Sequence, residues 1–146
     1  MLGATCTMYP GPGVSFAAMK ITQHYVALDA ADHIEEAAFW ASVFDGEVGD
    51  EPGWDDWRTV KVDGRTVIAV QQAPDYVVPE WPSDDPTRQQ QQAHLDIYVD
   101  QAEVAAAEAE VLELGARLLQ GHEDVTAPEG FRVYADPAGH PFCICW

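Results

Sequence analysis

Tryptophan and acidic side chains are the most prominent chemical groups in this sequence. It contains five tryptophans in 146 residues, and Trp54 and Trp57 bracket two aspartates. Between positions 21 and 57 there is no lysine or arginine, although acidic residues are frequent there. Indole rings stack on planar ligands and attract cations over their faces, and carboxylates steer cations toward a site. The pattern favours a planar or cationic small molecule as ligand.

His94 and Cys143 are the residues whose chemistry could support a reaction. An imidazole titrates near neutral pH and can act as a general acid or base, so His94 is the catalytic candidate. A Cys143 nucleophile paired with His94 is conceivable, but nothing in the sequence marks this thiol as activated. The sequence lacks the motifs of serine hydrolases, phosphate-binding loops, dinucleotide-binding folds and paired redox cysteines.

The charge balance excludes several classes of partner. Seven basic residues against 25 acidic ones give a net charge of −18. Nucleic acids and anionic membrane surfaces both require a basic footprint, so neither is expected as a partner. No stretch approaches the roughly 18 apolar residues of a transmembrane helix. Cys143 and Cys145 are two apart on one face of a predicted strand, which is poor geometry for a disulfide, so we expect a reduced, cytoplasmic protein.

The sequence repeats one pattern twice. Residues 23–48 and 93–118 each read as a short strand, an amphipathic helix, a glycine stop and the start of another strand. Gly46 and Gly115 lie where a helix C-terminus needs a left-handed residue. Hairpins are expected to follow each helix. They turn at Asp63-Gly64 in the first copy and around Asp136 in the second, where Asp136 caps the turn, Arg132 pairs with it and His140 is a turn residue.

These elements predict an α+β fold made of two βαβββ modules. The modules span 20–72 and 93–146, joined by the proline- and glutamine-rich linker 73–92. Two such units would bury their sheets by forming a curved mixed sheet around a cavity. Residues 1–18 are expected to be a flexible N-terminal extension of a single domain spanning 19–146.

Two motifs carry a family resemblance. The helix F-W-x-x-x-F-x-G, beginning at Phe39, and the hairpin D-P-x-G-H-P-F, beginning at Asp136, together resemble the glyoxalase-like subgroup of the vicinal-oxygen-chelate superfamily. The resemblance covers most of 20–146. It implies paired βαβββ modules, a homodimer and a cavity for small molecules. Members include lyases, isomerases, dioxygenases, thiol transferases and metal-free antibiotic-binding resistance proteins, so the fold alone does not fix the reaction.

The resemblance also implies where a metal would bind. Metal-using relatives take His or Gln, His and Glu ligands from the first and last strands of their modules. In the second module these positions match His94 and Cys143. In the first module the last-strand position matches Ile68, while the first-strand position matches His24 by the internal repeat or Tyr25 by the family spacing.

Our leading functional hypothesis is a glyoxalase-like protein that binds or sequesters a small molecule without a metal. The expected ligand-binding residues are His24, Tyr25, Trp57, His94 and Cys143. One alternative is a metal-dependent lyase or isomerase in which His24, His94 and Cys143 hold a divalent metal. A second alternative is a cofactor-free enzyme of natural-product metabolism that uses His94 as acid or base. Because a thiol replaces a carboxylate at position 143, we expect metal-free protein.

Overall fold

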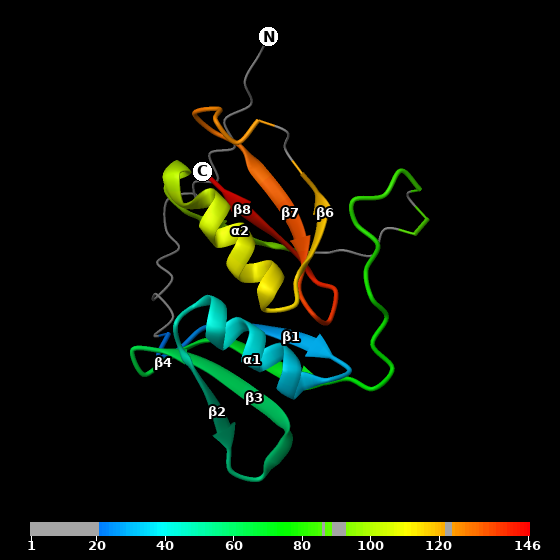
Figure 1. Ribbon diagram of the computed structural model, residues 1–146. Helices are drawn as coiled ribbons and strands as arrows, with labels where there is room; N and C mark the ends of the chain where they lie inside the picture. The colour runs from blue at the N-terminus through cyan, green and yellow to red at the C-terminus, as the bar shows by residue number, and fades with distance from the viewer. Residues whose placement is uncertain (1–20, 86, 89–92, 122–123) are drawn as a thin grey trace, which may run out of the picture.

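The computed structural model describes residues 21–85, 87–88, 93–121 and 124–146, which form two βαβββ modules (Figure 1). The first module consists of β1 (Val26–Ala30), α1 (His33–Val43), β2 (Glu47–Glu51), β3 (Trp54–Val62) and β4 (Arg65–Gln72). The second consists of β5 (Leu95–Tyr98), the 3₁₀ turn η1 (Gln101–Glu103), α2 (Val104–Glu113), β6 (Arg117–Gln120), β7 (Phe131–Ala135) and β8 (Pro141–Cys145). The predicted α+β fold of paired modules is confirmed. The expected extension 1–18 lies outside the described residues.

Each module has its own four-stranded mixed sheet. The strand order is β1-β4-β3-β2 in the first and β5-β8-β7-β6 in the second, so the two halves have the same topology. β1 pairs in parallel with β4, and β5 with β8, whereas the remaining pairs are antiparallel. In the part of the chain that the structure describes, the two sheets remain separate and do not hydrogen-bond into the single curved sheet that the sequence pattern predicts. No helix among the described residues is long and apolar enough to span a bilayer.

The helix ends follow local chemistry, with one correction. Asp32 caps α1 by accepting hydrogen bonds from the backbone N–H groups of Ile34 and Glu35. Gly115 has the predicted left-handed conformation, with φ of 109°. At the end of α1, however, it is Asp45 that is left-handed, with φ of 49°, and not Gly46. Gly46 is required for a different reason: a Cβ there would lie 2.6 Å from the carbonyl oxygen of Lys61.

The two predicted hairpin turns are confirmed. Asp63 and Gly64 both have positive φ, as a type I′ turn requires. In the second hairpin, Oδ1 of Asp136 accepts hydrogen bonds from the N–H groups of Gly139 and His140, at 2.8 and 2.7 Å. The expected pairing of Arg132 with Asp136 is wrong. Arg132 instead donates to the carboxylate of Glu108 on α2, because the two carboxylate oxygens of Asp136 already accept buried donors.

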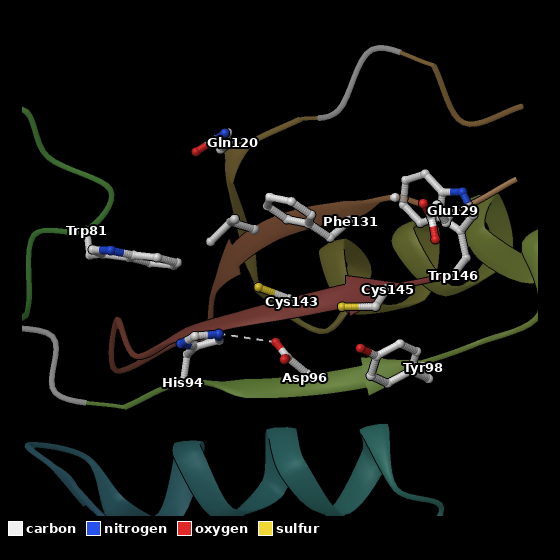
Figure 2. Close-up of a pocket in the computed structure, with 12 residues that line it drawn as sticks. Trp81, His94, Asp96, Tyr98, Gln120, Glu129, Phe131, Cys143, Cys145 and Trp146 are labelled. Atoms are coloured by element: carbon white, nitrogen blue, oxygen red, sulfur yellow. Dashed lines mark ion pairs between the residues drawn. The ribbon is translucent and has the colours of Figure 1, made fainter. Parts of the chain in front are cut away.

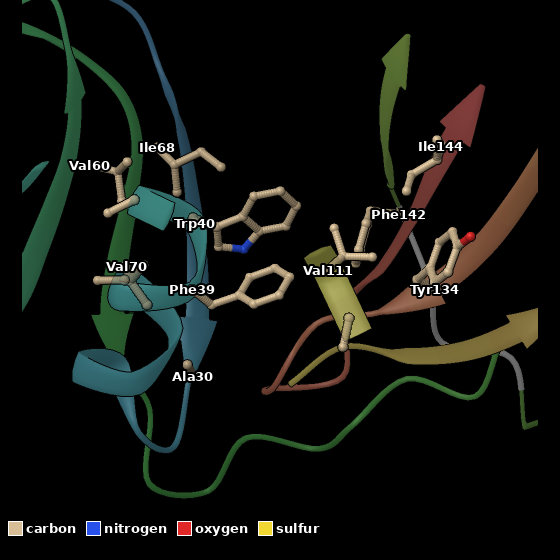
Figure 3. Packing of buried hydrophobic residues seen from close by; sticks show 13 residues of the cluster. Ala30, Phe39, Trp40, Val60, Ile68, Val70, Val111, Tyr134, Phe142 and Ile144 are labelled. Carbon is tan, nitrogen blue, oxygen red and sulfur yellow. The ribbon is translucent and has the colours of Figure 1, made fainter. Parts of the chain in front are cut away.

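One hydrophobic core joins the two modules on their helix sides (Figure 3). Trp40 on α1 is fully buried, and its ring lies 5.3 Å from the ring of Phe142 on β8. Phe39 packs on the same phenyl ring at 5.9 Å. Because each sheet buries its helix side in this shared core, the functional groups of both sheets are carried by the opposite faces.

Candidate functional site

Strand alternation gives β8 two chemically different faces. Phe142 and Ile144 enter the shared core, whereas Cys143 and Cys145 point to the opposite side and pack with Val133 of β7. We call this opposite side of the second sheet the second open face. Cys143 therefore projects toward the second open face, although the residue itself is buried.

β5 brings polar side chains to the same face. Leu95 and Ile97 pack against the shared core, so His94, Asp96 and Tyr98 project to the second open face. Figure 2 shows His94 and Asp96 beside the two cysteines on the neighbouring strand. The parallel pairing of β5 with β8 places Asp96 directly opposite Cys143.

A pocket of about 670 Å³ covers this face. It combines aromatic rings, two acidic groups, one imidazole and two thiols, and none of its described lining residues is a lysine or arginine. The lining residues are Trp81, His94, Asp96, Tyr98, Gln120, Glu129, Gly130, Phe131, Val133, Cys143, Cys145 and Trp146.

The segment between the modules places Trp81 over this pocket. The Trp81 ring stacks on the His94 ring, with centroids 5.3 Å apart and an interplanar angle of 20°. Two further contacts dock the same segment onto the second module. The Tyr76 ring lies 5.1 Å from the His140 ring, and Val78 occupies the space that a side chain at Gly139 would need. Trp81 is therefore held as a wall of the pocket.

His94, Asp96 and Cys143 converge at the floor of the pocket. His94 Nε2 lies 3.2 Å from Asp96 Oδ1. One donor atom from each of the three residues lies within 4.8 Å of the other two. The structure thus brings together the two second-module candidates from the sequence and adds a carboxylate between them.

The environment of Cys143 does not favour a free thiolate. Burial, together with the adjacent Asp96 carboxylate, raises the pKa of the Cys143 thiol to about 12. Burial and Asp96 also raise the pKa of Cys145. The thiols are thus protonated at neutral pH, which argues against an activated Cys143 nucleophile.

The donor chemistry at the pocket floor discriminates between kinds of metal ion. An imidazole nitrogen, a carboxylate oxygen and a thiol sulfur form a mixed set that is acceptable for Zn²⁺. Mg²⁺ and Mn²⁺ prefer oxygen-rich, octahedral surroundings, which this set does not supply. The residues present therefore fit a thiophilic ion and do not fit a hard one.

The first-module candidates lie on a different surface. His24 and Tyr25 line a pocket of about 890 Å³ together with Lys61 and Arg65. Tyr25 and Trp57 also line a smaller pocket of about 430 Å³. Neither pocket shares a lining residue with the second open face. Within one chain, the structure does not bring His24, Tyr25 or Trp57 together with His94 and Cys143.

Sheet register shows which first-module positions correspond to the second-module candidates. Val26 pairs with Ile68 in the first sheet, and Leu95 pairs with Phe142 in the second. The residue before Val26 is Tyr25, and the residue before Leu95 is His94. Tyr25 and His94 therefore occupy equivalent positions in the two modules. Likewise, Ala69 corresponds to Cys143, and the sequence-based match to Ile68 is wrong because Ile68 is buried in the shared core.

A second titratable cluster is buried between the modules. Trp40 Nε1 donates to Glu36 Oε1 at 2.9 Å and to Asp136 Oδ2 at 3.2 Å, and His140 Nδ1 lies 3.0 Å from Asp136 Oδ2. Glu36 also accepts a hydrogen bond from the backbone N–H of Ala138. Burial raises the pKa of Glu36 to about 7.

The same cluster holds His140 as a cation. Burial opposes its charge, but hydrogen bonds with Asp136 and Glu36 raise the pKa of His140 to about 10. Burial likewise opposes the charge of Asp136, but hydrogen bonds with His140 and Glu36 keep its pKa below the usual range. Glu36 and Asp136 are fully buried and line none of the three pockets described, so we assign the cluster a structural role.

Several pocket residues were not identified as ligand-binding candidates from the sequence. Asp96 is the most informative, since its signal was present: it lies two residues from His94, and side chains two apart share one face of a strand. Trp81 was identifiable only as a linker tryptophan, because no pattern shows which module a linker contacts. Glu129 belongs to an irregular segment whose path depends on tertiary packing.

Comparisons with known proteins agree with this architecture. A family model described as a glyoxalase-like domain matches residues 25–145. The sequence has no significant match among curated proteins. The fosfomycin resistance protein FosX from Listeria monocytogenes is similar in structure, with a TM-score of 0.63 and 14% identity over 87% of this chain and 91% of that one.

Two further solved structures share the fold. A glyoxalase/bleomycin resistance protein/dioxygenase family enzyme from Burkholderia phytofirmans PsJN has a TM-score of 0.60 and 18% identity, covering 83% of this chain and 94% of the other. A glyoxalase-related enzyme from Fulvimarina pelagi has a TM-score of 0.59 and 20% identity, covering 86% and 88%. At these identities the structures establish the fold alone. The match to the family model over 25–145, with the paired βαβββ modules, shows that this chain belongs to the glyoxalase-like domain family.

Proposed function

We propose that this protein binds a planar, cationic small molecule in the pocket on the second open face. The observation that carries the proposal is the stacked pair of Trp81 and His94 at the edge of a pocket that also contains Asp96 and Glu129. An aromatic wall and two carboxylates, with no lysine or arginine among the described lining residues, attract a cation and repel an anion.

The shape of the lining supports a flat guest. Trp81, Tyr98, Phe131 and Trp146 supply ring surfaces around the pocket, and Tyr98 is 76% exposed. An exposed ring of this size gains apolar contact when a planar ligand covers it. The volume of about 670 Å³ lies within the range of small-molecule sites.

Dye binding followed by fluorescence polarisation tests this proposal. Proflavine is a planar aromatic cation, and fluorescein is a planar anion of similar size. We expect the protein to bind proflavine and not fluorescein, and Trp81→Ala to weaken proflavine binding about tenfold. Trp54→Ala is the matched control, because Trp54 is 63% exposed on the first module. Equal binding of both dyes, or equal losses in the two variants, would contradict the proposal.

Binding or sequestration is the function that these features support best, and the similarity to a fosfomycin resistance protein is compatible with it. The second candidate is a metal-dependent lyase or isomerase. It is favoured by the convergence of His94, Asp96 and Cys143, which together could hold an ion beneath a ligand. Metal analysis of protein purified without a histidine tag distinguishes the two functions.

We further propose that the protein is a homodimer of the reducing cytoplasm. The first module carries the exposed apolar side chains of Tyr25 and Val67 outside the proposed ligand pocket, which a second copy could cover. Cys143 and Cys145 are free thiols, as expected in a reducing compartment. Sedimentation velocity of the full chain tests the dimer, and a monomer at micromolar concentration would contradict it.

A further inference from the structure

Residues 76–81, which we call the strap, cross from the first module to the second without forming a helix or a strand. The N–H of Tyr76 donates to the carbonyl oxygen of Ala73, whose own N–H donates to Ala30 at the end of β1. Among the described residues, the strap makes no hydrogen bond with the second module. Its attachment to that module therefore depends on side-chain packing.

Tyr76 is the first anchor of the strap. Its ring lies 5.1 Å from the ring of His140, with an interplanar angle of 39°. Although burial opposes the charge of His140, hydrogen bonds with Asp136 and Glu36 raise its pKa to about 10. The imidazole is therefore a cation at neutral pH, and an aromatic ring at this distance attracts it.

Val78 is the second anchor. It packs so closely on Gly139 that a Cβ at that glycine would overlap the valine side chain. Gly139 has a φ of 99°, and its N–H donates to Oδ1 of Asp136 at 2.8 Å. Val78 thus rests on a turn whose backbone is fixed by a buried carboxylate.

The two anchors together restrict the position of Trp81. Trp81 follows Tyr76 by five residues, which can span up to roughly 17 Å of extended chain. It follows Val78 by only three, or about 10 Å, and one of these is Pro79, whose ring fixes φ. The stacking of Trp81 on His94 therefore requires both anchors.

The docked position of the strap is only weakly stabilised. The hydroxyl oxygen of Tyr76 is buried and has no hydrogen-bond partner among the described residues, so its loss of hydration opposes docking. Val77 and Val78 remain 67% and 53% exposed. A segment with few buried contacts and no hydrogen bonds to its neighbour opens at a small cost in free energy.

We propose that the strap docks reversibly and that its docking is coupled to ligand binding, with Tyr76 and Val78 as the residues that position Trp81. This inference rests on the proposed function, because it concerns the same pocket. Only the docked strap presents Trp81 to the ligand, so partial release of the strap lowers the apparent affinity. By linkage, the bound ligand strengthens the docking of the strap to the same extent.

Nuclear Overhauser contacts in the ligand-free full chain test the positioning of Trp81. We expect Tyr76→Ala to remove most of the contact intensity between the Trp81 and His94 rings, and Val78→Ala to reduce it. Tyr76→Phe should retain these contacts, because it keeps the ring and removes only the unpaired hydroxyl. Val77→Ala is the matched control for Val78→Ala and should also retain them.

A double-mutant cycle on proflavine affinity tests the coupling. Tyr76→Ala should weaken binding about fivefold, which corresponds to the loss of one ring contact. In the Trp81→Ala background the same substitution should cause no further loss, because Tyr76 acts through Trp81. A purely structural effect of Tyr76 would instead weaken binding equally in both backgrounds. Equal thermal midpoints of the variants would show that the fold is intact.

The reverse direction of the coupling is measured in Tyr76→Ala itself. Saturating proflavine should restore the Overhauser contact between the Val78 methyl groups and Gly139, because the ligand binds Trp81 and holds the strap in place. A contact that stays weak in the saturated variant contradicts the coupling.

Two further results would overturn the proposal: ring contacts of Trp81 that are unchanged in Tyr76→Ala, or additive losses of affinity in the cycle. A wild-type chain that binds no proflavine contradicts the proposed function, and the ligand-free contacts then decide by themselves whether Tyr76 positions Trp81. A chain that binds proflavine while its ring contacts are insensitive to Tyr76→Ala contradicts only the strap.

Discussion

The open faces of the two modules differ in chemistry although the modules share one strand order. The first module presents Lys61 and Arg65 around His24 and Tyr25, whereas the second presents Asp96, Glu129 and two thiols. The helix sides, by contrast, form one continuous core. The two modules therefore match in their strand order and bury their helix sides together, while their exposed strand positions differ, as expected if packing constrains only the buried face.

The largest effect on stability is expected from a substitution in the shared core of the two modules. Trp40→Ala should lower the free energy of unfolding by about 4 kcal/mol, because it removes a fully buried ring together with the indole N–H that donates to Glu36 and Asp136. Urea unfolding followed by circular dichroism measures the loss, with Trp54→Ala as the exposed control. If each module unfolded in its own transition, the description of a common core would be wrong.

The buried cluster between the modules should make stability depend on pH. Glu36 and His140 both have a pKa that is higher in the folded state than the values of 4.5 and 6.5 expected for the unfolded chain. Their contributions to the free energy of unfolding are complete at a pH below these unfolded-state pKa values. They are lost as the pH rises through about 7 for Glu36 and about 10 for His140. Stability should therefore fall between pH 5 and pH 10, by on the order of 2 kcal/mol for Glu36.

The matched variant for this pH dependence is Glu36→Gln. Glu36 uses both carboxylate oxygens, and glutamine keeps only one acceptor for the Trp40 and Ala138 donors, so overall stability falls. Because glutamine does not titrate, the decline between pH 5 and pH 7 should nevertheless disappear. Thermal unfolding across this range measures it. Asp136 acts in the opposite sense, because its pKa is lowered, and its contribution is lost only under acidic conditions. A wild-type stability that rises from pH 5 to pH 9 would contradict this assignment.

The two helices provide a smaller comparison. α1 is capped by Asp32 through two backbone N–H groups, whereas Glu103 at the start of α2 makes no side-chain cap. Asp32→Ala should cost about 1 kcal/mol of stability, and Glu103→Ala should change it by less than about 0.5 kcal/mol. Equal losses in denaturant unfolding would show that local capping does not distinguish the helices.

The smallest expected effect concerns the charges of the pockets. Glu129→Gln should weaken proflavine binding about threefold, since an exposed carboxylate contributes under 1 kcal/mol to the attraction of a cation. Glu51→Gln is the control in the first module and should leave the affinity unchanged. A larger loss in the control than in Glu129→Gln would place the cation on the first module.

Local patterns were sufficient to predict the repeated elements. The spacing of apolar residues identified the helices, and Asp63-Gly64 identified a hairpin because its two positive φ values suit those residues. The left-handed position after α1 was assigned to Gly46 instead of Asp45, because a glycine at a helix end can be required for space as well as for backbone freedom.

The candidate site was only partly predictable. The second-module pair of His94 and Cys143 was found from the family pattern, and strand alternation explains why both reach one face. The sequence could not show that Trp81 packs on His94, that Ile68 is buried, or that His24 lies in a separate pocket. Those facts depend on how the linker docks and on how two sheets pack against each other, which no local pattern encodes.

Nuclear magnetic resonance of the five tryptophan indole N–H groups tests most directly whether the second open face is the ligand site. The signals are assigned by single Trp→Phe substitutions, and proflavine is then titrated into the full chain. Trp81 and Trp146 line the pocket on the second open face, whereas Trp54 and Trp57 line the smaller pocket of the first module. We expect the Trp81 and Trp146 signals to shift while those of Trp54 and Trp57 remain in place. Shifts confined to Trp54 and Trp57 would contradict the account and assign the site to the first module.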